Sequence, residues 1–406
     1  MGWVSGSRRS AVLIFLASLL VAEGVLAYAF LIGGGSGPAG PPLPLHPVVG
    51  TFEPDDTTIE ECDDQACFEQ AFGNIAFVSG PKDAMALLDE SVAAQRIPAD
   101  GKCHRIAHII GAASLARNRG NVARTFAEGS STCFSGYYHG ILERSLSEVR
   151  SYSADSLGAV VRDLCSDPLF RASPWLADQC AHGLGHGLMI ATGYSLPLAL
   201  LVCERLDARW DRRSCKSGAF MENLSSSYGV TSRYLRDDDP LYPCNWVRGD
   251  ENKAVCYGLV TSRIIRLGLD WHQTAEVCAG AEKGYVAMCF GSFGRDIAGA
   301  TRLDPVAIRE TCVVARSYGR ERACVYGAVR AVVGNYAGGA EAAVICNGTL
   351  PKLRAGCYFV LGSVLGSVRS TPAAREADCR ALTAVRRHVS ACIEGTRGTR
   401  PTSSPA

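Results

Sequence analysis

The sequence has no excess of charge of either sign. Its 406 residues include 41 Lys and Arg and 40 Asp and Glu, which gives a formal net charge of +1 at pH 7. The basic residues are interspersed among acidic ones, so the chain has no basic stripe of the kind that binds nucleic acid. We therefore exclude nucleic acid as a partner. The 47% content of hydrophobic residues indicates a folded protein with a large core.

Several motifs that define common enzyme classes are also missing. The chain has no Gly-x-Ser-x-Gly nucleophile elbow, no phosphate-binding loop and no Cys-x-x-Cys-His haem attachment site. Two closely spaced histidine pairs read HRIAH and HGLGH, without the Glu that follows the first His in zinc proteases. These absences argue against an elbow-type serine hydrolase, a P-loop protein, a c-type cytochrome and a zinc protease.

One apolar run is long enough to span a membrane. It covers residues 11–32, follows Arg8 and Arg9, and as a helix would rise about 33 Å. The two arginines predict a cytoplasmic stub over residues 1–10, a transmembrane signal-anchor over 11–32, and the rest of the chain on the extracytoplasmic side. A secreted protein is the alternative, because Ala27-Tyr28-Ala29 fits the cleavage site of a signal peptide. We expect any protein partner to be a membrane or extracytoplasmic protein.

Composition divides the remaining chain into three parts. Residues 33–58 are rich in Gly and Pro, which predicts a linker. Residues 59–395 are predicted to form a disulfide-laced helical repeat domain, with a His-rich part at 103–190, and residues 396–406 a disordered tail. The 18 cysteines, in an extracytoplasmic protein, indicate disulfides.

From Cys165 onward the cysteines recur in pairs with a nearly fixed period. The members of a pair are 11 to 15 residues apart, and successive pairs begin 33 to 41 residues apart, most often 34. Such a period is typical of a solenoid of two-helix repeats. The predicted pairs are Cys165–Cys180, Cys203–Cys215, Cys244–Cys256, Cys278–Cys289, Cys312–Cys324, Cys346–Cys357 and Cys379–Cys392. Nearer the N-terminus we expect Cys62 to pair with Cys67, and Cys103 with Cys133 as the starts of neighbouring helices.

Glycines inside the predicted helices indicate close packing. They lie three residues after a cysteine at Gly136, Gly183, Gly218 and Gly327. Because Gly in a helix interior costs about 1 kcal/mol, its repetition predicts helices whose backbones are in contact. The period and the pairing resemble the disulfide-bridged Sel1-like and tetratricopeptide-like solenoids, in which a cysteine closing one helix bonds the cysteine that opens the next. The resemblance implies an all-α solenoid of two-helix repeats over residues 62–392, and carries no ligand with it.

Five of the eight histidines lie in three short stretches that each begin at a cysteine: CHRIAHIIG, CFSGYYHGILER and CAHGLGHG. The five are His104, His108, His139, His182 and His186. The first and third stretches each have two histidines at i and i+4, and the second has His139 and Glu143 at that spacing, so each helix presents two possible metal ligands on one face. Equivalent helices are neighbours in a solenoid, so the three faces can converge.

The later repeats provide an internal control. His139 and His186 lie six residues after their cysteines, where the later repeats have Met221, Ser262, Arg295, Arg330, Ser363 and Gly398. The scaffold therefore does not require histidine at this position. The alternative is that the five are core histidines bonded to backbone carbonyls or to tyrosines such as Tyr137 and Tyr138. The isolated His46, His272 and His388 are expected to have no role in a site.

We interpret the five histidines as ligands of a transition metal, with copper, iron and zinc all open. Glu143 is expected to be a sixth ligand, a group that orients a ligand, or a catalytic proton acceptor, and Tyr137 and Tyr138 to line the site. The leading hypothesis is a membrane-anchored extracytoplasmic metalloprotein, an oxidoreductase that uses copper or iron. The alternatives are a non-catalytic helical-repeat scaffold for protein or peptide binding, and metal sequestration or delivery.

Overall fold

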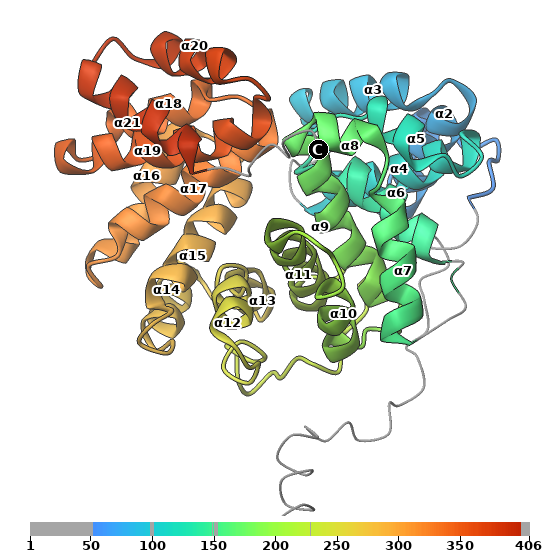
Figure 1. Ribbon diagram of the computed structural model, residues 1–406, viewed down its shortest axis with the longest axis horizontal. Coiled ribbons are helices and arrows are strands. Elements are labelled where there is room, and N and C mark those ends of the chain that lie inside the picture. The colour runs from blue at the N-terminus through green and yellow to red at the C-terminus, as the bar shows by residue number, and fades with distance from the viewer. Residues whose placement is uncertain (1–51, 98–100, 148, 150–152, 228, 399–406) are drawn as a thin grey trace, which may run out of the picture. The chain divides into compact units, whose positions relative to one another are not determined.

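The described part of the protein is built from α-helices. This computed structural model describes residues 52–97, 101–147, 149, 153–227 and 229–398, and no β-strand occurs within those ranges. Figure 1 shows the helices packed side by side in chain order. The all-α prediction is therefore confirmed for the described residues.

One series of helices forms the backbone of the repeats. Each member packs against the next one in the series. The series is α2 (Gln65–Val78), α4 (Gly101–Arg117), α6 (Gly136–Ser147), α9 (Pro174–Ala191), α11 (Arg209–Leu224), α12 (Asp250–Tyr257) with α13 (Thr261–Arg266), α15 (Val286–Ala300), α17 (Glu321–Tyr336), α19 (Pro351–Val368) and α21 (Arg386–Arg397).

Shorter helices connect the members of this series. They are α3 (Pro81–Ala93), α5 (Val122–Ala127), α7 (Ala154–Leu164), α8 (Pro168–Ala172), α10 (Leu196–Cys203), α14 (Trp271–Ala279), α16 (Pro305–Cys312), α18 (Ala340–Gly348) and α20 (Pro372–Leu382), with 3-10 turns η2 (Ile59–Glu61) and η3 (Val313–Arg316). Local sequence sets many of their starts. In α16, for example, the Asp304 side chain accepts from the backbone N–H of Ala307, and Pro305 occupies the first turn.

All nine disulfides match the pairs expected from the cysteine period, including Cys62–Cys67 and Cys103–Cys133. In the regular repeats the first cysteine lies near the end of a short helix and the second within the following long helix. Closing a loop of about 12 residues contributes about 3 kcal/mol by the chain-entropy estimate. The disulfides thus supplement the nearest-neighbour packing of the repeats.

One repeat departs from the two-helix pattern. Its first helix is replaced by turns between Leu224 and Asp250, and its second is divided into α12 and α13. The segment contains the run Asp237–Pro240 and a further proline, Pro243. Asp competes with helical hydrogen bonds and Pro removes a donor, so both residues favour turns here.

Glycines bring neighbouring long helices into backbone contact. A Cβ atom on Gly136 or Gly140 of α6 would lie 2.5 or 1.9 Å from a carbonyl oxygen of α4, and the nearest atom to Gly140 is the backbone oxygen of His108. On α11, a Cβ on Gly218 would lie 1.9 Å from the carbonyl oxygen of His182 in α9. A Cβ on Gly187 of α9 would lie 2.8 Å from the carbonyl oxygen of Leu142 in α6. The predicted backbone contacts are therefore confirmed, and they join α4, α6, α9 and α11 in succession.

The predicted boundaries of the repeat domain need small adjustments. Residues 52–58, assigned to the linker from their composition, pack onto α2, where Asn74 donates hydrogen bonds to Asp55 and Thr57. At the other end α21 continues to Arg397. Residues 1–51, with the predicted stub, signal-anchor and most of the linker, and residues 399–406 lie outside the described residues. No helix in the described ranges is both long and apolar enough to cross a membrane.

The later repeats also contact the first ones. Asn335, near the end of α17, accepts hydrogen bonds from the Ser131 hydroxyl and the Phe134 backbone N–H, each at 3.0 Å. Helix α19 in turn contacts α9. Segments about 200 residues apart in the chain are thereby joined, and a cavity lies between them.

Candidate metal centre

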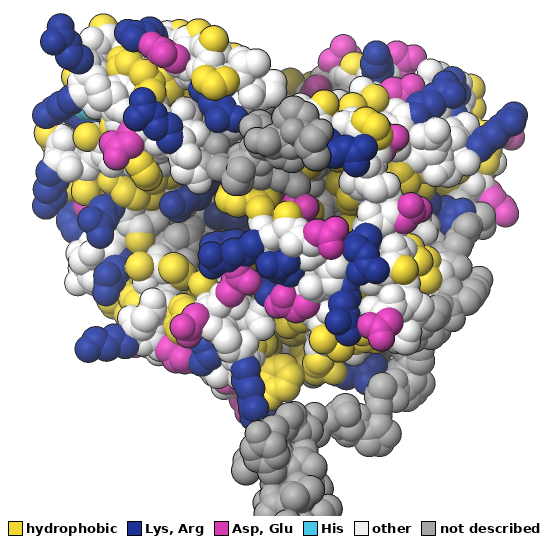
Figure 2. All heavy atoms as spheres, viewed as in Figure 1, with side chains coloured by type: hydrophobic (Ala, Val, Ile, Leu, Met, Phe, Trp, Pro, Cys, Tyr) yellow, Lys and Arg dark blue, Asp and Glu magenta, His cyan; other side chains and the backbone are white. Residues whose placement is uncertain are grey.

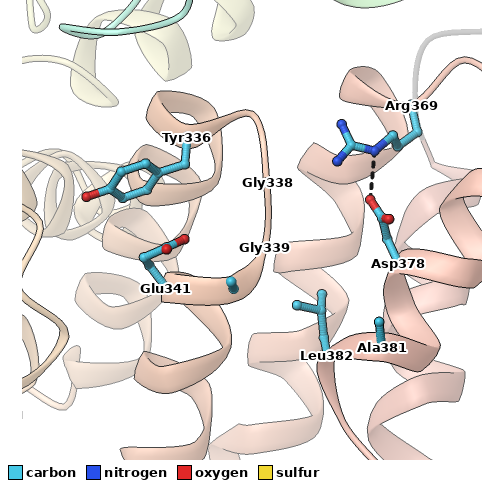
Figure 3. A pocket seen from close by; sticks show the side chains of 9 residues that line it. Tyr336, Gly338, Gly339, Glu341, Arg369, Asp378, Ala381 and Leu382 are labelled. Carbon is cyan, nitrogen blue, oxygen red and sulfur yellow. Dashed lines mark ion pairs between the residues drawn. The ribbon is translucent and has the colours of Figure 1, made fainter. Parts of the chain in front are cut away.

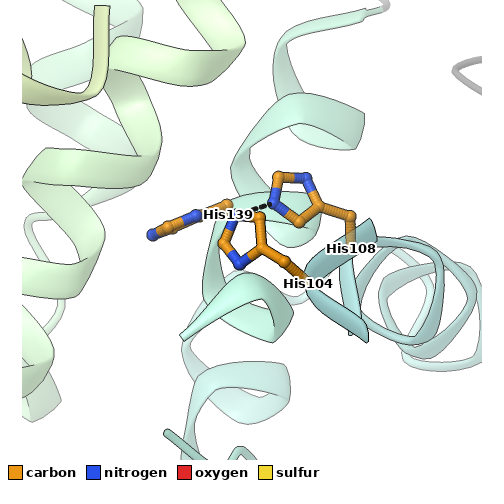
Figure 4. Close-up of side chains that lie close together, drawn as sticks. All are labelled: His104, His108 and His139. Atoms are coloured by element: carbon orange, nitrogen blue, oxygen red, sulfur yellow. Dashed lines mark hydrogen bonds between the residues drawn. The ribbon is translucent and has the colours of Figure 1, made fainter. Parts of the chain in front are cut away.

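The structure brings all five histidines into one cluster. His104 and His108 come from α4, His139 from α6, and His182 and His186 from α9, which are consecutive helices of the long series. The His139 ring is central, since its centroid lies 4.5 to 5.3 Å from the centroids of the other four rings. Figure 4 shows the rings of α4 and α6 converging. The close glycine packing described above makes this convergence possible.

The cluster contains two groups of three histidines that share His139. Each group has one nitrogen per ring within 4.8 Å of the others, and either group could hold a metal ion. The Nε2 atoms of His104 and His108 are 2.9 Å apart, and those of His182 and His186 are 3.3 Å apart. Two nitrogens bound to one tetrahedral zinc ion lie about 3.4 Å apart. The spacing within each pair is therefore close to that of two ligands on one ion.

Hydrogen bonds on the opposite side of the rings fix their orientation. Nδ1 of His104 lies 2.7 Å from the Cys133 carbonyl oxygen, which can only accept. Nδ1 of His108 lies 2.9 Å from a carboxylate oxygen of Glu143, and Nδ1 of His186 lies 3.0 Å from one of Glu222. Protons on these Nδ1 atoms leave lone pairs on Nε2, as in metal-bound histidines that donate to a carboxylate or carbonyl.

Burial keeps the cluster neutral. Desolvation lowers the pKa of His104 and His108 to about 4, and the neighbouring imidazole adds to the effect at His104. Desolvation lowers the pKa of His182 and His186 to about 3 and that of His139 well below its ordinary value. Neutral imidazole is the form of histidine that binds a metal.

Glu143 lies behind the rings rather than between them. One of its carboxylate oxygens is 2.9 Å from Nδ1 of His108 in α4, and the other is 3.7 Å from Nδ1 of His186 in α9. Glu143 thereby connects a histidine of α4 with a histidine of α9. This position fits a group that orients ligands, and Glu143 also forms, with His186 and Glu222, a third group that could hold a metal ion.

Glu222 of α11 belongs to the same arrangement and was missed in the sequence analysis. It is fully buried, and it accepts hydrogen bonds from His186, from the Tyr194 hydroxyl and from the Ser227 hydroxyl and backbone N–H. Burial raises its pKa, and the donors from Ser227 and Tyr194 oppose that shift. A single carboxylate in the apolar stretch AFMENL was the available signal, but Glu222 has no histidine at helical spacing in its own helix.

We expect Glu222→Gln to weaken metal binding by about 10- to 100-fold, because the amide is neutral and can turn its NH₂ group toward His186. Competition with a chelator of known affinity measures the effect. Glu276→Gln, an exposed carboxylate on α14, is the control and should leave the affinity unchanged. Equal affinities in the two variants would contradict the orienting role of Glu222.

Tyr137 and Tyr138 do not line the histidine cluster, contrary to expectation. The Tyr137 hydroxyl donates to the backbone oxygen of Thr125, and the Tyr138 ring packs on Phe126, both in α5. Successive helical residues are about 100° apart, so the tyrosines that precede His139 point elsewhere. Their burial raises the pKa of both phenols, that of Tyr138 to about 12.

Two of the isolated histidines lie apart from the cluster. His272 is exposed, and His388 is buried and stacked on Tyr358. His46 lies outside the described residues.

The cluster opens on one side into a cavity of about 560 Å³. His104, His139 and His182 line it, whereas His108 and His186 are buried behind them. The other lining residues come mainly from α9, α11, α13, α15 and α17. Sites for small molecules typically have volumes of about 300–1,000 Å³, so the cavity could admit a substrate to the histidines.

A second cavity, of about 380 Å³, lies near the C-terminal end of the repeats (Figure 3). Its charged side chains include Arg369 and Asp378, which form an ion pair at 2.8 Å. No histidine lines it, and we assign it no function.

Comparison with known proteins gives no assignment. No protein-family model, no curated protein and no solved structure matches the chain. The resemblance to Sel1-like and tetratricopeptide-like solenoids therefore remains one of helical repeats and disulfide pairing.

Proposed function

We propose that the protein is an extracytoplasmic metal-dependent oxidoreductase whose metal centre is formed by His104, His108, His139, His182 and His186. One observation carries the proposal: within each histidine pair, two Nε2 atoms face each other at 2.9 or 3.3 Å. In both pairs at least one Nδ1 atom is held by a carboxylate or a carbonyl. The nine disulfides support a location outside the cytoplasm.

A cation between the facing nitrogens accounts for this geometry. In the α4 pair both Nδ1 atoms face acceptors, so both Nε2 lone pairs are directed at one another in a buried setting. Two lone pairs at that distance repel, and a metal ion that both nitrogens bind removes the repulsion. The donors to Glu222 other than His186 are neutral, so a nearby metal ion also balances its buried negative charge.

The ligand set favours copper first and iron second. All five candidate ligand atoms are imidazole nitrogens, which suit copper, iron and zinc better than magnesium or calcium, and copper forms the most stable complexes of the divalent series. A structural zinc site would close with four ligands, whereas this cluster has five histidines and an open side. A redox-active metal held by these histidines would supply electron-transfer chemistry to a molecule bound in the cavity.

Metal analysis of the oxidised protein tests the proposal. The full chain, purified with its disulfides intact and without a nickel column, should contain one or two equivalents of copper or iron by inductively coupled plasma mass spectrometry. Metal that exchanges freely, without turnover of any substrate, would favour sequestration or delivery. A protein that contains no metal and binds none when it is added would refute the proposal and favour a binding scaffold.

A further inference from the structure

Arg330 is a cation without a partner in the cavity that the histidines line. It lies on α17, and no hydrogen bond or ion pair joins it to another residue in the described part of the chain. Arg295, the other arginine of the lining, bonds instead to Asp296 and to the Leu259 carbonyl oxygen. Only one of these two arginines is therefore available to a ligand.

The repeat explains why Arg330 lines the same cavity as the histidines. It lies six residues after Cys324, the position that His139 occupies after Cys133. Three later repeats have Met221, Ser262 and Arg295 there, and these residues also line the cavity. In these five repeats the position lines the cavity, with a candidate metal ligand at His139 and a guanidinium at Arg330, whereas His186 at the same position is buried behind the lining.

The surroundings of Arg330 are unfavourable for an unpaired cation. Desolvation by the surrounding protein lowers the pKa of Arg330 and the positive charge of Arg213 adds to that effect, although the residue keeps contact with solvent. Lys and Arg side chains gather around the hollow at the centre of the face in Figure 2. The negative charge of a bound anion would offset both the desolvation penalty and the repulsion from Arg213.

The two acidic side chains that line the cavity, those of Asp178 and Asp296, accept hydrogen bonds from other residues of the protein. Asp296 pairs with Arg295 and accepts from the Thr261 hydroxyl, and Asp178 accepts from the Trp210 indole N–H. Among the described lining residues, Arg330 is therefore the positively charged side chain that has no protein partner.

The rest of the lining fits an apolar body. Trp175 and Trp271 contribute indole rings, and Ile265 and Val364 contribute aliphatic side chains. Flat aromatic surfaces and aliphatic side chains bind hydrocarbon or ring systems, while a few polar groups fix their orientation.

We propose that the cavity binds a small organic carboxylate, with its anionic group at Arg330 and its apolar body against the two tryptophans, next to the histidine cluster. The proposal names the substrate class of the metal centre and in that respect rests on the proposed function. The guanidinium group of arginine can donate two parallel N–H hydrogen bonds to a planar carboxylate. A carboxylate therefore fits Arg330 better than a spherical anion does.

Calorimetric titration with benzoate and its neutral analogue benzamide tests the anion site. The full chain should bind benzoate at least about tenfold more tightly than benzamide, because the amide has no charge to offer Arg330. Arg330→Gln should weaken benzoate binding at least about tenfold. The matched control is Arg322→Gln, which removes an exposed arginine of the same helix that does not line the cavity; its affinity should equal that of the wild type.

The proposal is overturned if wild-type protein does not bind benzoate, if benzamide binds as tightly, or if Arg330→Gln binds benzoate as well as the wild type does. The comparison of the two ligands on wild-type protein needs no variant, so it holds even if Arg330→Gln fails to fold. The metal content of each sample separates the two proposals. Arg330-dependent binding of benzoate to a protein that takes up no metal would retain the anion site and refute the metal centre.

Discussion

Replacing His139 with alanine should reduce the metal content from one or two equivalents to less than about 0.1. His139 belongs to both groups of three histidines, so its loss leaves each group with only two imidazoles. Its Nδ1 atom is buried without a hydrogen-bond partner in the described structure, so no protein group competes with a metal ion for this nitrogen. Plasma mass spectrometry of the purified variant measures the effect, and far-UV circular dichroism should show the helical fold intact.

The matched control is His388→Ala, which removes another buried histidine, on α21, and should retain the full metal content. Two double variants then count the ions. The first is His104→Ala/His108→Ala and the second is His182→Ala/His186→Ala. If the protein binds two ions that share His139, each double variant should lose one of the two metal equivalents. If the protein binds one ion, each double variant should lose all of its metal. Full metal content in His139→Ala would show that His139 is not a ligand.

Replacing Gly140 with alanine should destabilise the protein by at least about 3 kcal/mol and weaken metal binding as well. The new Cβ would lie 1.9 Å from the carbonyl oxygen of His108 and 2.7 Å from its Cα, so α6 would have to move away from α4. Overpacking of this kind typically costs about 1–3 kcal/mol, and more where the obstacle is backbone. Because His139 and Glu143 lie on the displaced helix, their contacts with His108 should be lost together. Urea unfolding under oxidising conditions and metal analysis measure the two effects.

Gly291→Ala is the control for Gly140→Ala. It also places alanine inside a long helix, but we expect it not to destabilise the protein. Gly291 lies inside α15, and a Cβ added there would meet no atom within 4 Å. Alanine is favoured over glycine in a helix interior by about 1 kcal/mol, so this variant should be slightly more stable than the wild type and retain its metal. A Gly140→Ala variant as stable as Gly291→Ala would show that the tight packing of α4 and α6 is not required.

The sequence predicted much of the fold because the repeat makes each position comparable with its equivalents. Cysteines that recur with a nearly fixed spacing indicated which residues meet, and all nine pairs form. The same register placed His104 and His108 on a helix beside the one that carries His139. The repeat between Leu224 and Asp250 was not distinguished from the others in the prediction, although its cysteine pair begins 41 residues after the preceding one, where 34 is the usual interval.

Features that depend on distant contacts could not be predicted. Glu222 approaches the cluster only because α11 packs on α9, and its own helix has no histidine that would mark it as part of a ligand set. The cavity likewise requires α17 to return to the loop before α6, where Asn335 meets Phe134. Tyr137 and Tyr138 were assigned to the site from their nearness to His139 in sequence, but the rotation of the helix directs them toward α5.

The hydrogen bonds that Asn335 accepts from Ser131 and Phe134 bear on the cooperativity of unfolding. In an open array each repeat touches only its neighbours, so terminal repeats can fray without disturbing distant ones. Here α17 is joined both to its neighbours and to the segment just before α6. Local opening of the later repeats would break these bonds and admit bulk water to the cavity beside His139. The seventh cysteine pair along the chain, Cys312–Cys324, ties α17 to α16, and it thereby protects a site whose candidate ligands all lie more than 120 residues earlier in the sequence.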